Sequence, residues 1–283
     1  MADLTHVGVV GAGTMGHGIA QVAAQAGHAT VLFDRTLALA EQGKARIREN
    51  LEKGVAKGKV TPEARDAALG RLSVSAAMED FSPCGLVIEA VPEDLSLKRQ
   101  TFEALSRVCA QDAVLATNTS SLSVTEIAAC ASHPERVVGM HFFNPVHVMK
   151  LLEVIRAFQT SDETLARVRA VGERMGKQVV VINDHPGFAS TRLGIVLGMQ
   201  AIRMVEEGVA SAEDIDRAME LGYGHPMGPL KLTDLVGLDV RLAIAQYLYE
   251  ELGDPAFRPP QLLKKMVRAG QLGRKSGRGF YTY

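Results

Sequence analysis

A glycine-rich turn close to the N-terminus constrains the fold of this chain more than any other feature. Residues 7–10 form a short apolar run, Gly11-Ala12-Gly13-Thr14-Met15-Gly16 follows it, and residues 14–26 have a helical pattern. Glycine at position 11 permits a tight turn, and glycine at position 16 lets the helix pack closely on the strand. This order of strand, turn and helix predicts the start of a βαβ unit and a mainly parallel sheet.

Further strands and helices continue this pattern through the first two thirds of the chain. Strands are predicted at residues 31–33, 86–91, 114–116, 137–142, 151–155 and 178–182, and helices at about 95–109 and 162–175. A long charged helix at about 37–57 interrupts the alternation, and Thr61 followed by Pro62 announces a second helix. We therefore predict an α/β fold: a Rossmann-type, mainly parallel sheet domain with an inserted helical pair at about residues 37–70.

The pattern changes at Asn183-Asp184-His185-Pro186-Gly187, a cluster of turn-forming residues. Helices are predicted after it at roughly 188–207, 213–221, 229–251 and 260–269, and Ser211 and Asp214 are spaced like a capping box. A length of 283 residues also suggests two domains. We assign residues 1–183 to a dinucleotide-binding domain and residues 184–283 to an all-α domain for substrate binding and dimerisation.

Charge and cysteine content exclude several classes of protein. With 31 Lys and Arg against 32 Asp and Glu, the net charge of -1 gives no electrostatic reason to expect a nucleic-acid or membrane-surface partner. The cysteines, Cys84, Cys109 and Cys130, are odd in number and form no C-x-x-C pair, which argues against a disulfide framework or a thiolate zinc site. No other metal site is expected. Residues 4–33 lack charged side chains, but glycines and histidines interrupt them, so we expect a buried strand and helix there and a reduced, cytoplasmic protein.

The glycine-rich turn also predicts the cofactor. Gly13 lets a pyrophosphate approach the backbone, where free N–H groups and the positive end of the helix dipole face it. Asp34, just after the second strand, could accept both ribose hydroxyl groups and would repel a 2′-phosphate, which favours NAD. Arg35 could attract that phosphate, so NADP remains an alternative, as does a glycine-rich turn with a surface Asp. The residues predicted to hold NAD here are Gly11, Gly13, Thr14, Met15, Gly16 and Asp34.

His141 is the candidate general acid/base. It ends a predicted strand, at the sheet edge where α/β proteins place their ligands. If residues 137–142 and 151–155 form an antiparallel hairpin, paired residue numbers sum to about 294, which places Glu153 opposite His141. Cross-strand partners have Cβ atoms about 4.5–5.5 Å apart, so the carboxylate could orient the imidazole. The alternative, which the spacing alone does not exclude, is a Glu on the solvated face of an edge strand.

A polar segment, Asn118-Thr119-Ser120-Ser121, follows the strand at 114–116 on the same edge. Ser120 could donate a hydrogen bond to a substrate oxygen. The segment could also be a polar loop or a helix N-cap, the role favoured for Ser121.

Motifs spread in order over nearly the whole chain resemble the 3-hydroxyacyl-CoA dehydrogenase family, and the length resembles that of the bacterial 3-hydroxybutyryl-CoA dehydrogenases. They are Gly11 to Gly16, Glu89-Ala90-Val91-Pro92-Glu93, Asn118 to Ser121, His141-Phe142-Phe143-Asn144-Pro145, Leu152-Glu153-Val154-Ile155, Pro186-Gly187-Phe188, His225-Pro226-Met227-Gly228-Pro229, Asp234-Leu235-Val236-Gly237-Leu238-Asp239 and residues 273–281.

This resemblance implies reversible NAD-dependent oxidation of a short- to medium-chain 3-hydroxyacyl-CoA. It makes His141 the general acid/base, Glu153 its orienting partner and Ser120 a ligand of the substrate's 3-oxygen. Cofactor contacts are implied for Glu93 and Lys98 near the nicotinamide ribose, for Asn144 at the nicotinamide end, and for Asn118.

Other residues are expected to contact the acyl and CoA ends of the substrate. Thr191 stands where the family usually has Asn on the first helix of the second domain, and a hydroxyl has shorter reach and one donor. For the CoA phosphates we expect Lys53, Lys57 and Lys59, in a segment that carries six cations against three glutamates, although charged helices are more often simply solvated.

The resemblance also implies a homodimer formed through the helical domain. The apolar spacing of that domain's first helix fits an ordinary core equally well.

The sequence is also compatible with two other functions. Free 3-hydroxyacid dehydrogenases use a lysine early in the second domain, whereas residues 188–207 contain arginines and no lysine. A non-catalytic NAD-binding protein would need neither His141 nor Glu153.

Overall fold

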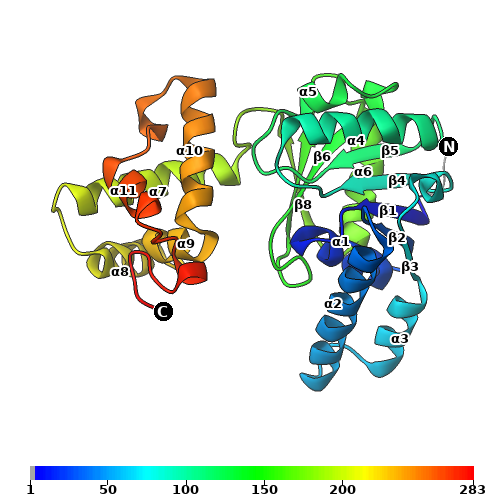
Figure 1. Ribbon diagram of the computed structural model, residues 1–283, viewed down its shortest axis with the longest axis horizontal. Coiled ribbons are helices and arrows are strands. Elements are labelled where there is room, and N and C mark those ends of the chain that lie inside the picture. Colours follow the sequence, from blue (N-terminus) through cyan, green and yellow to red (C-terminus); the bar gives the residue numbers. More distant parts are fainter. Residues whose placement is uncertain (1–3) are drawn as a thin grey trace. The chain divides into compact units, whose positions relative to one another are not determined.

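The computed structural model describes residues 4–283 and divides into two compact units, the first ending at His185 and the second spanning Pro186–Tyr283. Figure 1 shows a sheet covered by helices in the first unit and helices alone in the second. This arrangement confirms the predicted fold class. No helix within residues 4–283 is long and apolar enough to cross a membrane.

The first unit is built on one eight-stranded sheet with the order β3-β2-β1-β4-β5-β6-β7-β8. Neighbouring strands are parallel except for the antiparallel pair β6 and β7. The strands are β1 His6–Val10, β2 Ala29–Phe33, β3 Leu72–Ser75, β4 Leu86–Glu89, β5 Val114–Thr117, β6 Val137–Phe142, β7 Leu151–Arg156 and β8 Gln178–Asn183. Every residue of β4, β5 and β6 is buried, as expected for strands with both faces covered.

Helices pack against both faces of this sheet (Figure 1). They are α1 Thr14–Gln25, α2 Leu37–Ala56, α3 Pro62–Gly70, α4 Leu95–Val108, α5 Val124–Ala128 and α6 Asp162–Arg174. Helices α2 and α3 form the predicted inserted pair, and the Thr61 side chain caps α3 by accepting a hydrogen bond from the Ala64 N–H. Strand β3, which follows this pair, was not predicted.

The second unit contains five α-helices among the described residues: α7 Ser190–Glu206, α8 Ala212–Tyr223, α9 Pro229–Val236, α10 Leu238–Leu252 and α11 Gln261–Arg268. The prediction of one helix over 229–251 is wrong. Gly237 has a φ of 108°, which an α-helix does not allow, so α9 ends there and α10 begins anew. The Ser211 side chain accepts a hydrogen bond from the Asp214 N–H, which confirms the predicted N-cap of α8.

Two buried carboxylates fasten the last residues of the second unit to its helices. Asp216 on α8 accepts a hydrogen bond from the Tyr281 hydroxyl at 2.8 Å, besides those from the first turn of α9. Asp234 on α9 accepts from the backbone N–H groups of Phe280 and Tyr281 and from the Tyr283 hydroxyl. Both carboxylates are at most 1% exposed, so these donors replace the water that they lost.

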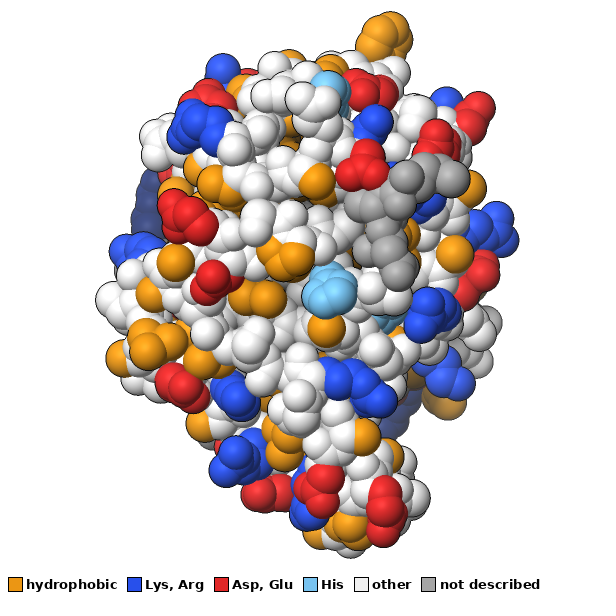
Figure 2. Space-filling model, turned by 90° about the vertical axis from the view of Figure 1, so that its right-hand side faces the viewer, with side chains coloured by type: hydrophobic (Ala, Val, Ile, Leu, Met, Phe, Trp, Pro, Cys, Tyr) orange, Lys and Arg blue, Asp and Glu red, His pale blue; other side chains and the backbone are white. Residues whose placement is uncertain are grey.

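Short 3-10 turns complete the secondary structure, at Met78–Phe81, Pro134–Arg136, Pro255–Phe257 and Arg274–Ser276. On the face drawn in Figure 2, basic and acidic side chains are interspersed, in keeping with the near-zero net charge.

Candidate active site

The glycine-rich turn joins β1 to α1 at the carboxyl edge of the sheet. Gly11 has a φ of +97°, and a Cβ there would lie 2.8 Å from the Ala90 carbonyl oxygen. A Cβ on Gly16 would lie 1.6 Å from the Gly11 oxygen, so both positions require glycine. Gly13 is the N-cap of α1, and no side chain caps this helix end. The N–H groups of the first turn are thus not taken up by a capping side chain, which suits an anionic ligand.

Asp34 is held beside this turn. Its Oδ2 accepts a hydrogen bond from the Ala12 N–H at 2.8 Å, and its Oδ1 accepts one from the Arg35 N–H at 2.7 Å. Asp34 is partly buried and Arg35 is exposed. The carboxylate is therefore fixed against the turn, at the position predicted from its spacing.

His141 and Glu153 face each other across the antiparallel strands β6 and β7, in the predicted register. The His141 Nδ1 lies 2.8 Å from the Glu153 Oε2. His141 is 5% exposed and Glu153 1% exposed, and β8 flanks β7 on its other side. The alternative of a solvated Glu on an edge strand is therefore wrong.

This contact fixes the orientation of the imidazole ring. Nδ1 is directed at the carboxylate, so proton exchange with a ligand would take place at the other ring nitrogen, Nε2. The Phe143 ring lies next to the imidazole, with ring centroids 4.4 Å apart. A carboxylate that stabilises the charged imidazole and fixes its tautomer is the arrangement that a general acid/base needs.

The loop after β5 is tied to the His141 strand and to Glu93. Asn118 Oδ1 accepts a hydrogen bond from the Phe142 N–H at 2.9 Å, and the Ser120 N–H donates to Glu93 Oε1 at the same distance. The Thr119 hydroxyl donates to that same oxygen. Ser120 is partly exposed. The hydrogen bonds to Phe142 and to Glu93 hold the backbone of its loop.

Ser121 does not cap a helix. It is buried, and the N-cap of α5 is Ser123, whose side chain accepts a hydrogen bond from the Glu126 N–H.

Lys98 is fully buried and belongs to an ion-pair network rather than to an open surface. Its Nζ lies 2.8 Å from Glu89 Oε1 and 3.5 Å from Glu93 Oε2. Glu89 is also fully buried and accepts hydrogen bonds from the Val91 N–H and the Thr117 hydroxyl. The predicted place of Lys98 near the nicotinamide ribose stays a prediction; in the structure its ammonium lies between Glu89 and Glu93. No role was predicted for Glu89 from the sequence. The feature that could have indicated one is an acidic residue at the end of an apolar strand.

Asn144 and Thr191 are two further residues with predicted ligand contacts. Asn144 is exposed in the turn after β6, three positions beyond His141. Thr191 belongs to the second unit, where it lies partly buried in the first turn of α7.

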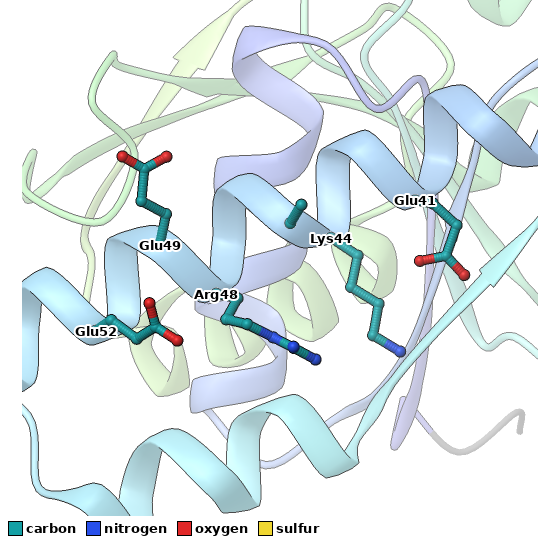
Figure 3. Close-up of a pocket in the computed structure, with 6 residues that line it drawn as sticks. Glu41, Lys44, Arg48, Glu49 and Glu52 are labelled. Atoms are coloured by element: carbon teal, nitrogen blue, oxygen red, sulfur yellow. The ribbon is translucent and has the colours of Figure 1, made fainter.

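The predicted CoA-binding lysines lie at the far end of α2 and beyond it. Lys53, Lys57 and Lys59 are all exposed, and Lys53 forms an ion pair with Glu49 at 2.6 Å. A hollow of about 290 Å³ lies along the same helix (Figure 3), lined by Glu41, Lys44, Ala45, Arg48, Glu49 and Glu52. Three carboxylates outnumber two cations there, and Lys44 donates to the Leu72 carbonyl oxygen. This hollow is therefore unsuited to phosphate.

Within residues 4–283, no group of three or more His, Cys, Asp or Glu side chains is arranged to hold a metal ion.

In comparison with known proteins, both units match domains of the same enzymes. Residues 6–185 match the 3-hydroxyacyl-CoA dehydrogenase NAD binding domain, and residues 187–283 match the C-terminal domain of the same enzymes. The chain is 48% identical over 281 residues to a probable 3-hydroxybutyryl-CoA dehydrogenase of Bacillus subtilis, covering 99% of this chain and 98% of that protein. It is 49% identical over 286 residues to the 3-hydroxybutyryl-CoA dehydrogenase of Mycobacterium tuberculosis, covering 100% of each.

Solved structures agree with this assignment. The crystal structure of (S)-3-hydroxybutyryl-CoA dehydrogenase PaaH1 from Ralstonia eutropha matches with a TM-score of 0.97 and 42% identity over 99% of both chains. That of M. tuberculosis FadB2 matches with a TM-score of 0.95 and 49% identity, again over 99% of both. These matches confirm the resemblance inferred from the motifs. The chain belongs to the 3-hydroxyacyl-CoA dehydrogenase family.

Proposed function

We propose that this protein catalyses the reversible, NAD-dependent oxidation of a short- to medium-chain 3-hydroxyacyl-CoA, such as 3-hydroxybutyryl-CoA, to the 3-ketoacyl-CoA. The observation that carries the proposal is the 2.8 Å contact between His141 and Glu153 at the end of β6, in a chain of this family. A protein that only binds a dinucleotide needs no buried imidazole–carboxylate pair.

The residues present fit the cofactor. The turn at Gly11 and Gly16 has no room for a Cβ, the first turn of α1 is uncapped, and Asp34 is fixed beside it. When bound, NAD accepts hydride from the substrate carbon in one direction, and its reduced form supplies it in the other. The negative charge of Asp34 next to the turn opposes a 2′-phosphate, which favours NAD over NADP.

His141 exchanges the proton. In oxidation its Nε2 takes the proton of the 3-hydroxyl group, and in reduction it returns a proton to the ketone oxygen. Glu153 stabilises the positive charge that the ring acquires, because its carboxylate is buried and already bonded to Nδ1. Proton transfer from a positioned group contributes about 10²- to 10⁴-fold to a rate.

Ser120 holds the oxygen on which this exchange takes place. Its N–H is bonded to Glu93, which leaves its hydroxyl to donate to the substrate's 3-oxygen. Glu93 and Asn144 hold the nicotinamide end of the cofactor, and Asn118 keeps the Ser120 loop next to β6 through its bond to Phe142.

Contacts with the two ends of the substrate come from other parts of the chain. Lys53, Lys57 and Lys59 bind CoA phosphates, and their exposure supports this role. Thr191 contacts the acyl end. The helical unit also forms the interface of a homodimer, which its exposed apolar side chains on α7 and α10 favour: Leu193 is 68% and Val240 40% exposed.

An assay with acetoacetyl-CoA and NADH tests the proposal. Turnover of acetoacetyl-CoA with free acetoacetate left unchanged is the expected result, and NADPH in place of NADH should be the poorer cofactor. Turnover of acetoacetate would identify a free 3-hydroxyacid dehydrogenase. NADH binding without turnover of either compound would identify a non-catalytic protein.

A further inference from the structure

A lysine with no assigned role holds the turn between β6, which carries His141, and β7, which carries Glu153. Lys177 lies between α6 and β8 and is 8% exposed. Its Nζ donates hydrogen bonds to the backbone carbonyl oxygens of Val146 and Met149, the latter at 2.8 Å. Both carbonyl groups lie in residues 143–150, here called the hairpin turn. One ammonium group thus ties together two points of the segment that joins the catalytic strands.

Other contacts leave the middle of the hairpin turn dependent on this tie. The N–H groups of Val148 and Met149 both donate to the Pro145 oxygen and close the turn only locally, while the Lys150 carbonyl at its end accepts a hydrogen bond from the Gln178 N–H. Val146 is buried against α1, where a Cβ on Gly18 would come within 2.9 Å of its side chain. The hairpin turn is therefore wedged between α1, which begins at the glycine-rich turn, and Lys177 on the β8 side.

No described acidic side chain neutralises the positive charge of Lys177. It lines a hollow of about 350 Å³ together with His147, Lys150 and Arg174, and the lining contains no Asp or Glu. No described residue forms an ion pair with Lys177, so its only strong partners are the two carbonyl oxygens. A charged donor makes stronger hydrogen bonds than a neutral one, and their loss would leave two carbonyl groups of the turn without partners.

We propose that Lys177 is a positioning residue, whose ammonium group fixes the hairpin turn and through it the relative placement of His141, Asn144 and Glu153. Only the kinetic part of this inference, the effect on kcat, rests on the proposed function. Its structural part, the immobilisation of residues 145–149, stands on the hydrogen bonds alone.

The charge of Lys177 gives the proposal a pH signature. Burial lowers the pKa of Lys177, and the groups around it are His147 and Lys150 in the hairpin turn, Arg174 on α6, and His17 on α1 next to His147. Burial, and then the charges of His17 and Lys177, also lower the pKa of His147. The ammonium form exists below the pKa, so the tie is lost as the pH rises, at a lower pH than for an exposed lysine.

The test compares Lys177→Met with Lys150→Met, its matched control. Lys150 is an exposed lysine in the same turn whose ammonium bonds to none of the described residues. In Lys177→Met we expect kcat with acetoacetyl-CoA to fall about 10- to 100-fold, as for a misplaced reacting group, with the KM for NADH little changed. Hydrogen exchange of the Val148 and Met149 amides should become faster. Lys150→Met should match the wild type in both measurements.

Lys177→Arg provides a second variant, because arginine keeps its charge at every accessible pH. It should retain activity at alkaline pH, where the wild type declines. Equal kcat in Lys177→Met and Lys150→Met, or unchanged amide exchange in Lys177→Met, would overturn the proposal. If wild-type protein does not reduce acetoacetyl-CoA, the proposed function fails, and amide exchange alone then decides whether Lys177 holds the turn.

Discussion

The carboxyl edge of the sheet and helix α2 are both rich in charged side chains, but they hold those charges in opposite ways. At the sheet edge, His141, Glu153, Glu89 and Lys98 are almost fully buried, and each has a partner at hydrogen-bond distance. On α2 the side chains of Lys53 and Glu49 are each 62% exposed. Buried charges lack water and must be met by specific protein groups, so they fix geometry. Water screens the charges of exposed ion pairs, so these pairs determine only the local charge of the surface and not its geometry.

Removing the imidazole should produce the largest effect. His141→Ala is expected to lower kcat by about 10²- to 10⁴-fold, because the proton then has no positioned acceptor. Steady-state kinetics and NADH fluorescence titration would measure turnover and cofactor binding separately. His133→Ala, at a partly exposed histidine, is the control. Near-normal turnover of a folded His141→Ala protein would refute the assignment.

Glu153→Gln should come next, since the ring keeps a hydrogen-bond partner but loses its anionic neighbour. We expect kcat to fall by roughly 10- to 100-fold, because the positive charge that the ring acquires during proton transfer is no longer stabilised. Steady-state kinetics with acetoacetyl-CoA would show this. An unchanged kcat would count against the pair.

Lys98→Met tests the buried network through stability. Its loss leaves Glu89 with a buried, uncompensated charge, which costs about 3–5 kcal/mol of unfolding free energy. Urea denaturation monitored by circular dichroism would measure it, with Lys53→Met as the exposed control that should change little. Equal effects of the two substitutions would erase the contrast between the sheet edge and α2.

Reversing the charges of Lys53, Lys57 and Lys59 together should have the smallest effect. The KM for acetoacetyl-CoA is expected to rise roughly tenfold, with kcat and the KM for NADH unchanged and the effect weaker at high salt. Initial-rate measurements at two salt concentrations would check this. An unchanged KM for the CoA substrate would remove these lysines from the site.

Much of the fold could be predicted because local patterns determine it. The glycine-rich turn and the hairpin arithmetic depend on short stretches of chain, and they placed Gly11 and the His141–Glu153 register correctly. Strand β3 is four residues long at a sheet edge and reads Leu-Ser-Val-Ser, too brief a pattern to distinguish from a loop. Gly237 broke a predicted helix because its φ depends on how α9 and α10 pack, and one glycine in a helical pattern does not reveal that.

The charged part of the site was harder to predict. A lysine is usually exposed, so nothing local indicated that Lys98 would be buried beside Glu89, nine positions away. Lys177 was missed for the same reason, since its partners lie 28 and 31 positions earlier in the chain. Only the folded sheet brings such residues together.

The hydrogen bonds that attach the last residues of the helical unit to Asp216 and Asp234 have a consequence for biosynthesis. Asp216 is made 65 positions before Tyr281, and Asp234 is made 46 positions before Phe280. As the chain leaves the ribosome, Asp216 can already accept from the N–H groups of Leu230 and Lys231. Asp234 must remain hydrated until residues 280–283 have emerged, because the helices cannot close over a bare carboxylate. A copy truncated before Phe280 would lack every one of these tail donors. Its helical unit would therefore be accessible to the proteases that degrade unfolded chains.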